Sequence, residues 1–430
     1  MKNQILLNKL VLFIVLITTI TYGQSSFAKE IEQGSLFDQF SPVEINGFVE
    51  ARVGARTQND PNEKNVSVME TRLQVELFTD TEWAEFKYKG DAWLDGVLED
   101  AKYDTREAWF FTRPTEFMDL KIGRQVLTWG TGDLVFLNDL FPKDWQSYFI
   151  GRDQEYLKAP SNAIKASLFS DISNIDIVYS PRFDPDRYIT GAYISYWDGR
   201  RQQIVGNDHT IIAITPDKWF QDDEIALRIY RNINNYELAL YGYWGYWKRP
   251  GGQTPSGKVI FPELNVYGAS ARGQIGPGIG NFEIAYYESV EDEDGSNPLI
   301  NNSEIRYLIG YAQDLGNDFN ASLQYYIEYM LDYDAYKASL PSGPAKDRAR
   351  HVITLLLTKL LFNQNLELSL SAYLSPSDLD AYVRPIARYK YSDNITLETG
   401  ANIFLGEDQY TFFAQFENNT NVYTAVRYCF

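Results

Sequence analysis

Apolar and polar residues alternate along most of this chain, and no other feature limits its fold as strongly. In the last ten residues, 421–430, Val422, Val426 and Tyr428 occupy one set of alternate positions, and Arg427 occupies the other. Alternation over eight or more residues is typical of a β-strand whose two faces meet different surroundings. A barrel would pair this last strand with the first and leave no open edge. The alternative is an ordinary edge strand of a soluble protein.

Segments with two different faces recur from residue 43 onward. In the first of them, Ile45 and Val49 share one face, whereas Glu50 and Arg52 share the other. A soluble sandwich also alternates, but the persistence of charge at alternate positions favours a barrel with a polar lumen. We count about 18 segments, or between about 16 and 20 depending on whether 184–223 and 410–416 belong to loops. The segments are 43–56, 68–78, 83–95, 105–113, 118–128, 163–170, 173–180, 224–231, 236–247, 261–273, 280–289, 304–314, 319–331, 351–362, 366–374, 381–391, 395–405 and 421–430.

The links between these segments alternate in length. Short links such as 232–235 and 315–317 are rich in Asn and Gly, which tight turns prefer, and they alternate with longer links such as 248–260 and 332–350. Transmembrane barrels have short periplasmic turns and long extracellular loops. The sequence therefore predicts an all-β fold, in which residues 43–430 form one transmembrane antiparallel β-barrel.

The N-terminus has the layout of a secretory signal. Lys2 and Lys9 precede the apolar run 10–20, and small residues follow it. The run is too short to span a bilayer, although a membrane-anchoring helix is the alternative interpretation. We expect a cleaved signal peptide, 1–28, and a periplasmic lead-in, 29–42. No later apolar run is long enough for a transmembrane helix, so a membrane protein of this sequence would have to be a barrel.

Composition argues against several classes of function. The net charge of −19 disfavours nucleic acid as a partner. Cys429 is the one cysteine, and with only His209 and His351 we predict no metal site and no cofactor. No nucleophile–histidine–acid set can be assembled, so we predict that the protein is not an enzyme. The acidic run 291–295 could bind Ca²⁺, remain a solvated charge run, or bridge to lipopolysaccharide through divalent cations.

Two stretches resemble known bacterial proteins. The residues Val426, Tyr428 and Phe430 resemble the closing strand of outer-membrane β-barrels, which typically ends in Phe with a Tyr two residues earlier. A second stretch contains Gly123-Arg124-Gln125, Trp129-Gly130, Asn138-Asp139 and Pro142-Lys143-Asp144. The spacing of these motifs resembles that of outer-membrane channels of the porin and alginate-export type. The two resemblances imply a Gram-negative outer-membrane location. They also imply membrane lipid, lipopolysaccharide and the barrel-assembly machinery as partners, the last acting through the C-terminal strand.

Residue parity places charges of both signs in the lumen. Most of them could simply pair across strands and keep the lumen wet. A dedicated alginate exporter would need a strongly basic lumen, whereas this one is mixed and slightly acidic. The leading hypothesis is therefore a porin-like channel for passive diffusion of small polar solutes. The alternatives are a substrate-dedicated export or uptake barrel, for a polysaccharide or an apolar compound, and a non-conducting structural or adhesion barrel. The predicted lumen lining includes Arg52, Glu70, Arg72, Glu85, Lys87, Arg228, Glu237, Arg306, Arg384 and Arg388.

The long link 129–162 is the predicted constriction. Links of this length are uncommon and usually functional, and an 18-stranded barrel is too wide for wall side chains to fill. This link also carries many apolar residues, which need a packed environment. The alternatives are that it forms an extracellular cap, or that 184–223 occupies the lumen instead. The residues predicted to lie near the narrowest point are Arg124, Asp139, Lys143, Asp144, Arg152 and Asp153.

Overall fold

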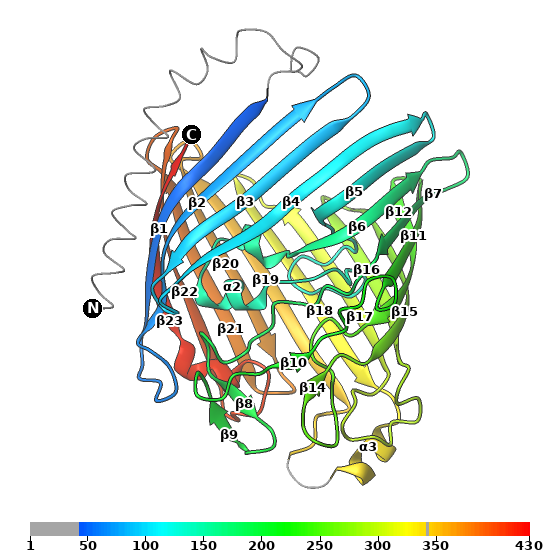
Figure 1. The fold of residues 1–430 in the computed structure, drawn as a ribbon, viewed down its shortest axis with the longest axis vertical. Coiled ribbons are helices and arrows are strands. Elements are labelled where there is room, and N and C mark those ends of the chain that lie inside the picture. Colours follow the sequence, from blue (N-terminus) through cyan, green and yellow to red (C-terminus); the bar gives the residue numbers. More distant parts are fainter. Residues whose placement is uncertain (1–42, 341–343) are drawn as a thin grey trace.

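The computed structural model describes residues 43–340 and 344–430. Its main element is one antiparallel sheet of 18 strands, in which the first strand, β1, pairs with both β2 and the last strand, β23. The sheet therefore closes into a barrel (Figure 1). The predicted all-β barrel and its strand number are confirmed. The predicted signal peptide, 1–28, and lead-in, 29–42, lie outside the described residues.

The barrel strands follow the predicted segments closely. In chain order they are β1 (Glu44–Arg56), β2 (Val66–Asp80), β3 (Glu85–Asp95), β4 (Asp100–Thr115), β5 (Met118–Val126), β6 (Pro160–Leu168), β7 (Asn174–Ser180), β11 (Glu224–Ile233), β12 (Tyr236–Tyr246), β15 (Glu263–Ile275), β16 (Gly278–Ser289), β17 (Glu304–Asp314), β18 (Phe319–Met330), β19 (Ala349–Leu361), β20 (Leu366–Ser375), β21 (Asp380–Lys390), β22 (Ile395–Gly406) and β23 (Asn421–Cys429).

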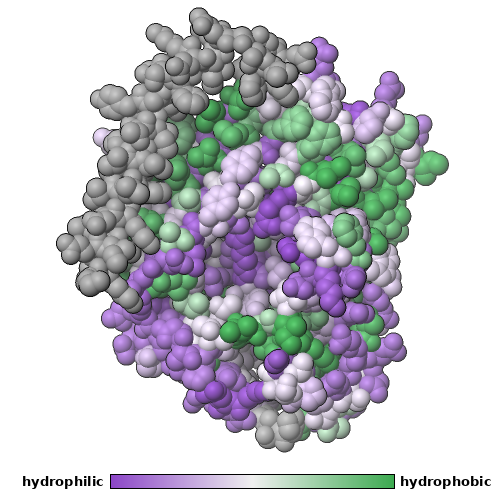
Figure 2. Space-filling view, viewed as in Figure 1, coloured by the Kyte–Doolittle hydropathy of each residue, from purple (hydrophilic) through white to green (hydrophobic). Residues whose placement is uncertain are grey.

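Period-two alternation explains why these strands form a barrel with a polar inside. Along β1, Glu50 and Arg52 are buried in the interior, whereas Ala51 and Val53 are exposed on the outer surface. The same alternation runs around the sheet, with outward Leu240, for example, 60% exposed. In Figure 2, hydrophilic residues line the hollow near the centre of the visible face.

The two ends of the barrel differ, because short turns lie at one end and long loops at the other. The turns place Asn and neighbouring residues at positive φ, as in 234–235 and 317–318, which two-residue hairpin turns require. The long loops gather at the lower end of Figure 1 and are called the loop end below.

Smaller elements lie within the long loops. The segment 184–223 contains β8 (Tyr196–Asp198), β9 (Gln203–Val205) and β10 (Ala213–Ile214), none of which joins the barrel sheet. The other short elements are α2 (Trp145–Ile150), η1 (Gln154–Leu157), β13 (Gly252–Gln253), β14 (Val259–Ile260), α3 (Tyr333–Ser339) and η2 (Ala414–Asn419). Among the residues that the structure describes, no helix is long and apolar enough to cross a membrane.

One irregularity changes which side chains face inward. The register between β3 and β4 shifts at Lys89/Gly90, where Glu107 pairs with Lys89 and Thr105 pairs with Gly90. Arg106 is the extra residue of this bulge and is 4% exposed. Counting alternate residues along β4 therefore does not predict which face of the strand Arg106 lies on.

Candidate channel constriction

Loop 129–162 leaves the barrel wall at the end of β5 and lies inside the lumen. Its first contact with the opposite wall is Glu283 of β16, which is 1% exposed. The Glu283 carboxylate accepts hydrogen bonds from the backbone and side chain of Thr131, from the Gly132 amide and from the backbone and side chain of Asn138. These five donors satisfy a buried carboxylate that has no ion-pair partner among the described residues.

The middle of the loop forms α2, which is packed against the inner wall. Asp144 caps the helix by accepting hydrogen bonds from the Ser147 amide and hydroxyl, and Gly151 ends it at a φ of 90°. The Phe149 side chain, 2% exposed, packs its ring 5.1 Å from that of Tyr382 and 5.3 Å from that of Phe404. The apolar residues of the loop thus form a core with the wall inside the barrel.

Beyond α2, two charged residues attach the loop to the wall near the seam between β23 and β1. Arg152 lies 2.9 Å from Glu70 of β2. Asp153 lies 3.3 Å from Arg388 of β21 and 3.0 Å from Arg427 of β23. Burial opposes ionisation of Asp153, but the two guanidinium groups outweigh it and lower the pKa of Asp153 to about 2. We call the pair Arg152 and Asp153 the ionic clamp.

The other residues predicted at the constriction are also paired. Lys143 and Asp139 lie 3.0 Å apart, with side chains 3% and 2% exposed, and Asp144 lies 3.4 Å from Arg187. Arg124 stands apart on the wall, where it donates to the Thr105 carbonyl. The structure therefore brings five of the six predicted residues onto one buried loop, and their charges face partners more than they face water.

The segment 184–223, considered above as a competing occupant, packs against the first loop. The Asp186 carboxylate accepts hydrogen bonds from the Lys143 amide at 2.7 Å and the Trp145 indole at 3.1 Å. The Arg187 amide donates a hydrogen bond to the Lys143 carbonyl, and the Arg187 guanidinium forms an ion pair with Asp104 of β4 at 2.7 Å. The first part of 184–223 thus packs against loop 129–162, whereas β8 and β9 of the same segment lie at the loop end (Figure 1).

Most of the residues predicted to line the lumen form ion pairs, some along one strand and some across strands. Arg306 lies 3.1 Å from Glu304 of the same strand, and Arg228 lies 2.6 Å from Glu237 of the neighbouring strand. Arg384 is the exception in this set, because no described carboxylate lies within ion-pair distance of it. The remaining pairs are Arg52 with Glu50 and Glu398, Arg72 with Glu70 and Asp91, Lys87 with Glu76 and Glu107, Glu85 with Arg113, and Arg388 with Glu398.

The predicted closing residues lie at the seam. Val426 and Tyr428 point outward and are 50% and 47% exposed. Phe430 exchanges two backbone hydrogen bonds with Gly47 of β1, at 3.0 and 3.1 Å. This contact extends the β1–β23 ladder to the last residue.

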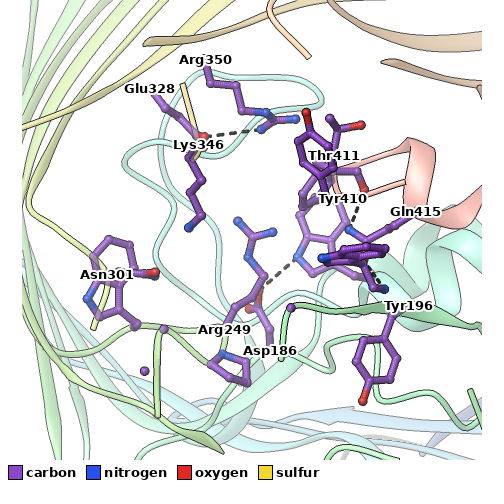
Figure 3. Close-up of a pocket in the computed structure, with 18 of the residues that line it drawn as sticks. Asp186, Tyr196, Arg249, Asn301, Glu328, Lys346, Arg350, Tyr410, Thr411 and Gln415 are labelled. Carbon is purple, nitrogen blue, oxygen red and sulfur yellow. Dashed lines mark hydrogen bonds and ion pairs between the residues drawn. The ribbon is translucent and has the colours of Figure 1, made fainter. Parts of the chain in front are cut away.

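The loops leave a cavity of about 1560 Å³ at the loop end of the lumen. Its floor includes Asp139 and Lys143 of the first loop, and its sides come from six other loops. Arg249 and Lys346 point into it from different loops (Figure 3). A smaller cavity of about 360 Å³ lies between the first loop and the wall at β2–β4. Among the described residues, no cluster of three or more His, Cys, Asp and Glu side chains is arranged to hold a metal ion.

The residues that sequence reasoning missed are mostly partners of the loop. Asp95, Asp104, Arg106 and Asp186 are examples, and all four contact loop 129–162 or its neighbour. Alternation on β3 could have indicated Asp95, but nothing in the sequence specifies contacts between two long loops.

Comparison with solved structures agrees with this architecture. The chain superimposes on Acinetobacter baumannii OccAB1 with a TM-score of 0.54 and 9% identity, over 93% of this chain and 99% of that one. It has the fold of the outer-membrane porins. Pseudomonas aeruginosa OccD3 (OpdP) matches with a TM-score of 0.52 and 9% identity, over 91% of both chains. No family model and no curated protein sequence matches the chain.

Proposed function

We propose that this protein is an outer-membrane channel in which loop 129–162 sets the constriction and small polar solutes diffuse past it. The observation that carries the proposal is a cavity lined by charged and polar residues inside a closed barrel. The cavity of about 1560 Å³ has walls of both charges, and the loop forms its floor. Barrels of this strand number leave an aqueous channel unless something occupies them. The occupant here narrows the lumen, so only small solutes pass.

The outer surface supports a membrane location. Outward Ile309 and Leu323 are 59% and 55% exposed, which suits acyl chains better than water. Aromatic residues also gather where interfacial girdles are expected. Toward the loop end, one outward aromatic residue stands on each of five successive strands: Trp244, Tyr267, Tyr286, Tyr307 and Tyr325.

A substrate-dedicated channel is the second candidate, and the cavity lining is what favours it. The Trp197 and Tyr410 rings lie 6.4 Å apart on the cavity wall, which Arg249 also lines. Aromatic faces of this kind can stack against a sugar ring or an apolar ring. Such a solute would bind in the cavity before it passes the loop.

Planar-bilayer recording of the purified full chain tests the proposal. The channel predicts discrete open steps, with weak ion preference if diffusion is passive. Saturable block of the current by one added solute class would favour the dedicated channel. Absence of any step, with correctly folded and heat-modifiable protein, would overturn the channel proposal.

A further inference from the structure

One section of the barrel wall is incomplete toward the loop end. The ladder between β4 and β5 runs only as far as Ala108, which pairs with Arg124. Beyond that pair, β4 continues to Asp100 with β3 as its only strand partner, because β5 ends at Val126 and the chain turns inward. Residues 100–107 of β4 thus form a free edge. We call the space between this edge and the ends of β5 and β6 the wall notch.

Side chains, and not a backbone ladder, cross the wall notch. Arg124 Nε donates to the Thr105 carbonyl at 2.6 Å, and Arg187 lies 2.7 Å from Asp104. The Arg124 and Arg187 side chains remain 23% and 34% exposed, so they do not seal the wall. In Figure 1, α2 is visible below β4, and the same place in Figure 2 is a hollow lined by hydrophilic residues.

The smaller cavity, of about 360 Å³, lies behind the free edge of β4. Lys102 and Asp104 of β4 line it on one side, and Ser147 of α2 lines it on the other. Trp93 of β3 also lines it and is the direct cross-strand partner of Lys102. The Trp93 indole N–H is buried and has no acceptor among the described residues.

These two neighbouring side chains favour a ligand with negatively charged oxygen atoms. An indole nitrogen and an ammonium group can only donate hydrogen bonds. The Lys102 ammonium lies 3.0 Å from Asp100, but both side chains are well exposed, and exposed ion pairs contribute little. Lys102 is therefore available to a ligand that enters the cavity.

The outer side of the wall notch borders the lipid-facing surface. Ile122 pairs directly with Phe110 on one side and with Ile164 on the other, and these three outward residues form an apolar row next to Arg124. Ile122 and Ile164 are each 39% exposed. One opening therefore connects an apolar outer surface with a polar cavity, which suits a molecule that has one apolar and one polar end.

We propose that the wall notch binds a single-chain amphiphile with an anionic head, such as a long-chain carboxylate, from the surrounding membrane. The head lies in the smaller cavity near Lys102 and Trp93, and the chain lies against Phe110, Ile122 and Ile164. This site goes beyond the channel proposal, because it is separate from the main cavity and would exist equally in a barrel that conducts nothing.

Protection of an introduced cysteine in phosphatidylcholine liposomes tests the site. The full chain with Cys429→Ser and Thr190→Cys carries its one thiol in the smaller cavity. Dodecanoate should slow the reaction of this thiol with a water-soluble maleimide several-fold. Acetate lacks the chain and dodecanol lacks the charge, so neither should protect it. Thr210→Cys places the thiol in the main cavity instead and should show no protection.

Four results would overturn the proposal: no protection by dodecanoate, or equal protection by acetate, by dodecanol or at position 210. Lys102→Gln should weaken the protection several-fold, whereas Lys258→Gln changes a cation of the main cavity and should leave it unchanged. Full protection in Lys102→Gln would contradict the assigned position of the head.

A crystal of the full chain with a long-chain carboxylate brominated at its chain end gives the direct test. The anomalous bromine peak should lie on the outer surface beside Ile122, with density for the carboxylate in the smaller cavity. A bromine peak in the main cavity, or none at the wall notch, would contradict the proposal. If Lys102→Gln loses its heat-modifiable band, this crystal decides.

Discussion

At the scale of single residues, the lumen is organised by buried polar groups that hold the loop. Glu283 shows this most clearly, since it serves five donors on three residues of the loop. Hydrogen bonds to a charged group contribute roughly 1.5–3 kcal/mol each, and buried donors left without an acceptor cost a comparable amount. One carboxylate on the wall can thus position the start of the loop.

Glu283→Ala should release the first part of the loop. We expect higher single-channel conductance, more current noise and faster proteolysis near Thr131, because the five donors lose their acceptor inside the barrel. Glu237→Ala is the matched control, since the Glu237 carboxylate pairs with the wall residue Arg228. Unchanged conductance and proteolysis in Glu283→Ala would show that this carboxylate does not hold the loop.

Glu63, in the loop after β1, should make the outer loops sensitive to pH. Burial, together with Asp60 and Asp208, raises the pKa of Glu63 to about 7, although Arg56 opposes the shift. Its folded pKa lies above its ordinary value of 4.5, so the ionised form is disfavoured in the folded loops. Stability is then lost as pH rises from about 4.5 to about 7.

We therefore expect the contact between the Asn62 carbonyl and the Asn207 amide to open more readily at pH 8 than at pH 5. Limited proteolysis of loop 184–223 at the two pH values measures this. Glu63→Gln should remove the difference, whereas an unchanged pH dependence in that variant would assign the titration to another group.

At the scale of elements, α2 acts as the apolar anchor of the loop. Its Phe149 ring packs against three rings of the wall and the loop end, those of Tyr382, Phe404 and Phe416, at 5.1–5.4 Å. Deletion of a buried aromatic side chain costs about 3–5 kcal/mol in a packed core. The ionic clamp lies directly after this helix, so one short element combines apolar and charged attachment.

Phe149→Ala should weaken loop seating while leaving the barrel closed. We expect the folded barrel to keep its heat-modifiable migration on a gel, because the hydrogen-bond ladders of the barrel do not depend on this side chain. We expect the conductance to rise, because the loop is held less firmly against the wall. Phe220→Ala changes a side chain that is 71% exposed and should alter neither property. Loss of the folded band in Phe149→Ala would mean that the loop supports the barrel itself.

At the scale of the whole molecule, the sequence predicts the strands of the barrel. It does not predict how the long loops pack against each other inside the barrel. Period-two alternation and Asn-rich turns are local features, and they predict all 18 strands to within five residues of their ends. The interlocking of two loops depends on contacts such as Asp186 with Lys143, which are 43 residues apart. Parity also fails at the Arg106 bulge, because one extra residue shifts the face.

The buried pairing of the loop charges changes what a charge-reversal experiment reports. A negative side chain at position 143 would repel Asp139 and Asp186, and one at position 152 would repel Glu70 and Asp95. Reversal of both charges should therefore displace the loop from the wall. Arg200 and Arg201 line the cavity at its exposed rim, and their reversal should change only the local charge.

Single-channel recording of these two double variants tests most directly whether loop 129–162 sets the constriction. Lys143→Glu with Arg152→Glu should give open steps clearly larger than those of the wild type. Arg200→Glu with Arg201→Glu should shift the reversal potential under a salt gradient toward cation preference and leave the step size nearly unchanged. If the first variant folds and keeps the wild-type conductance while the second alters it, the constriction lies in 184–223 and not in 129–162.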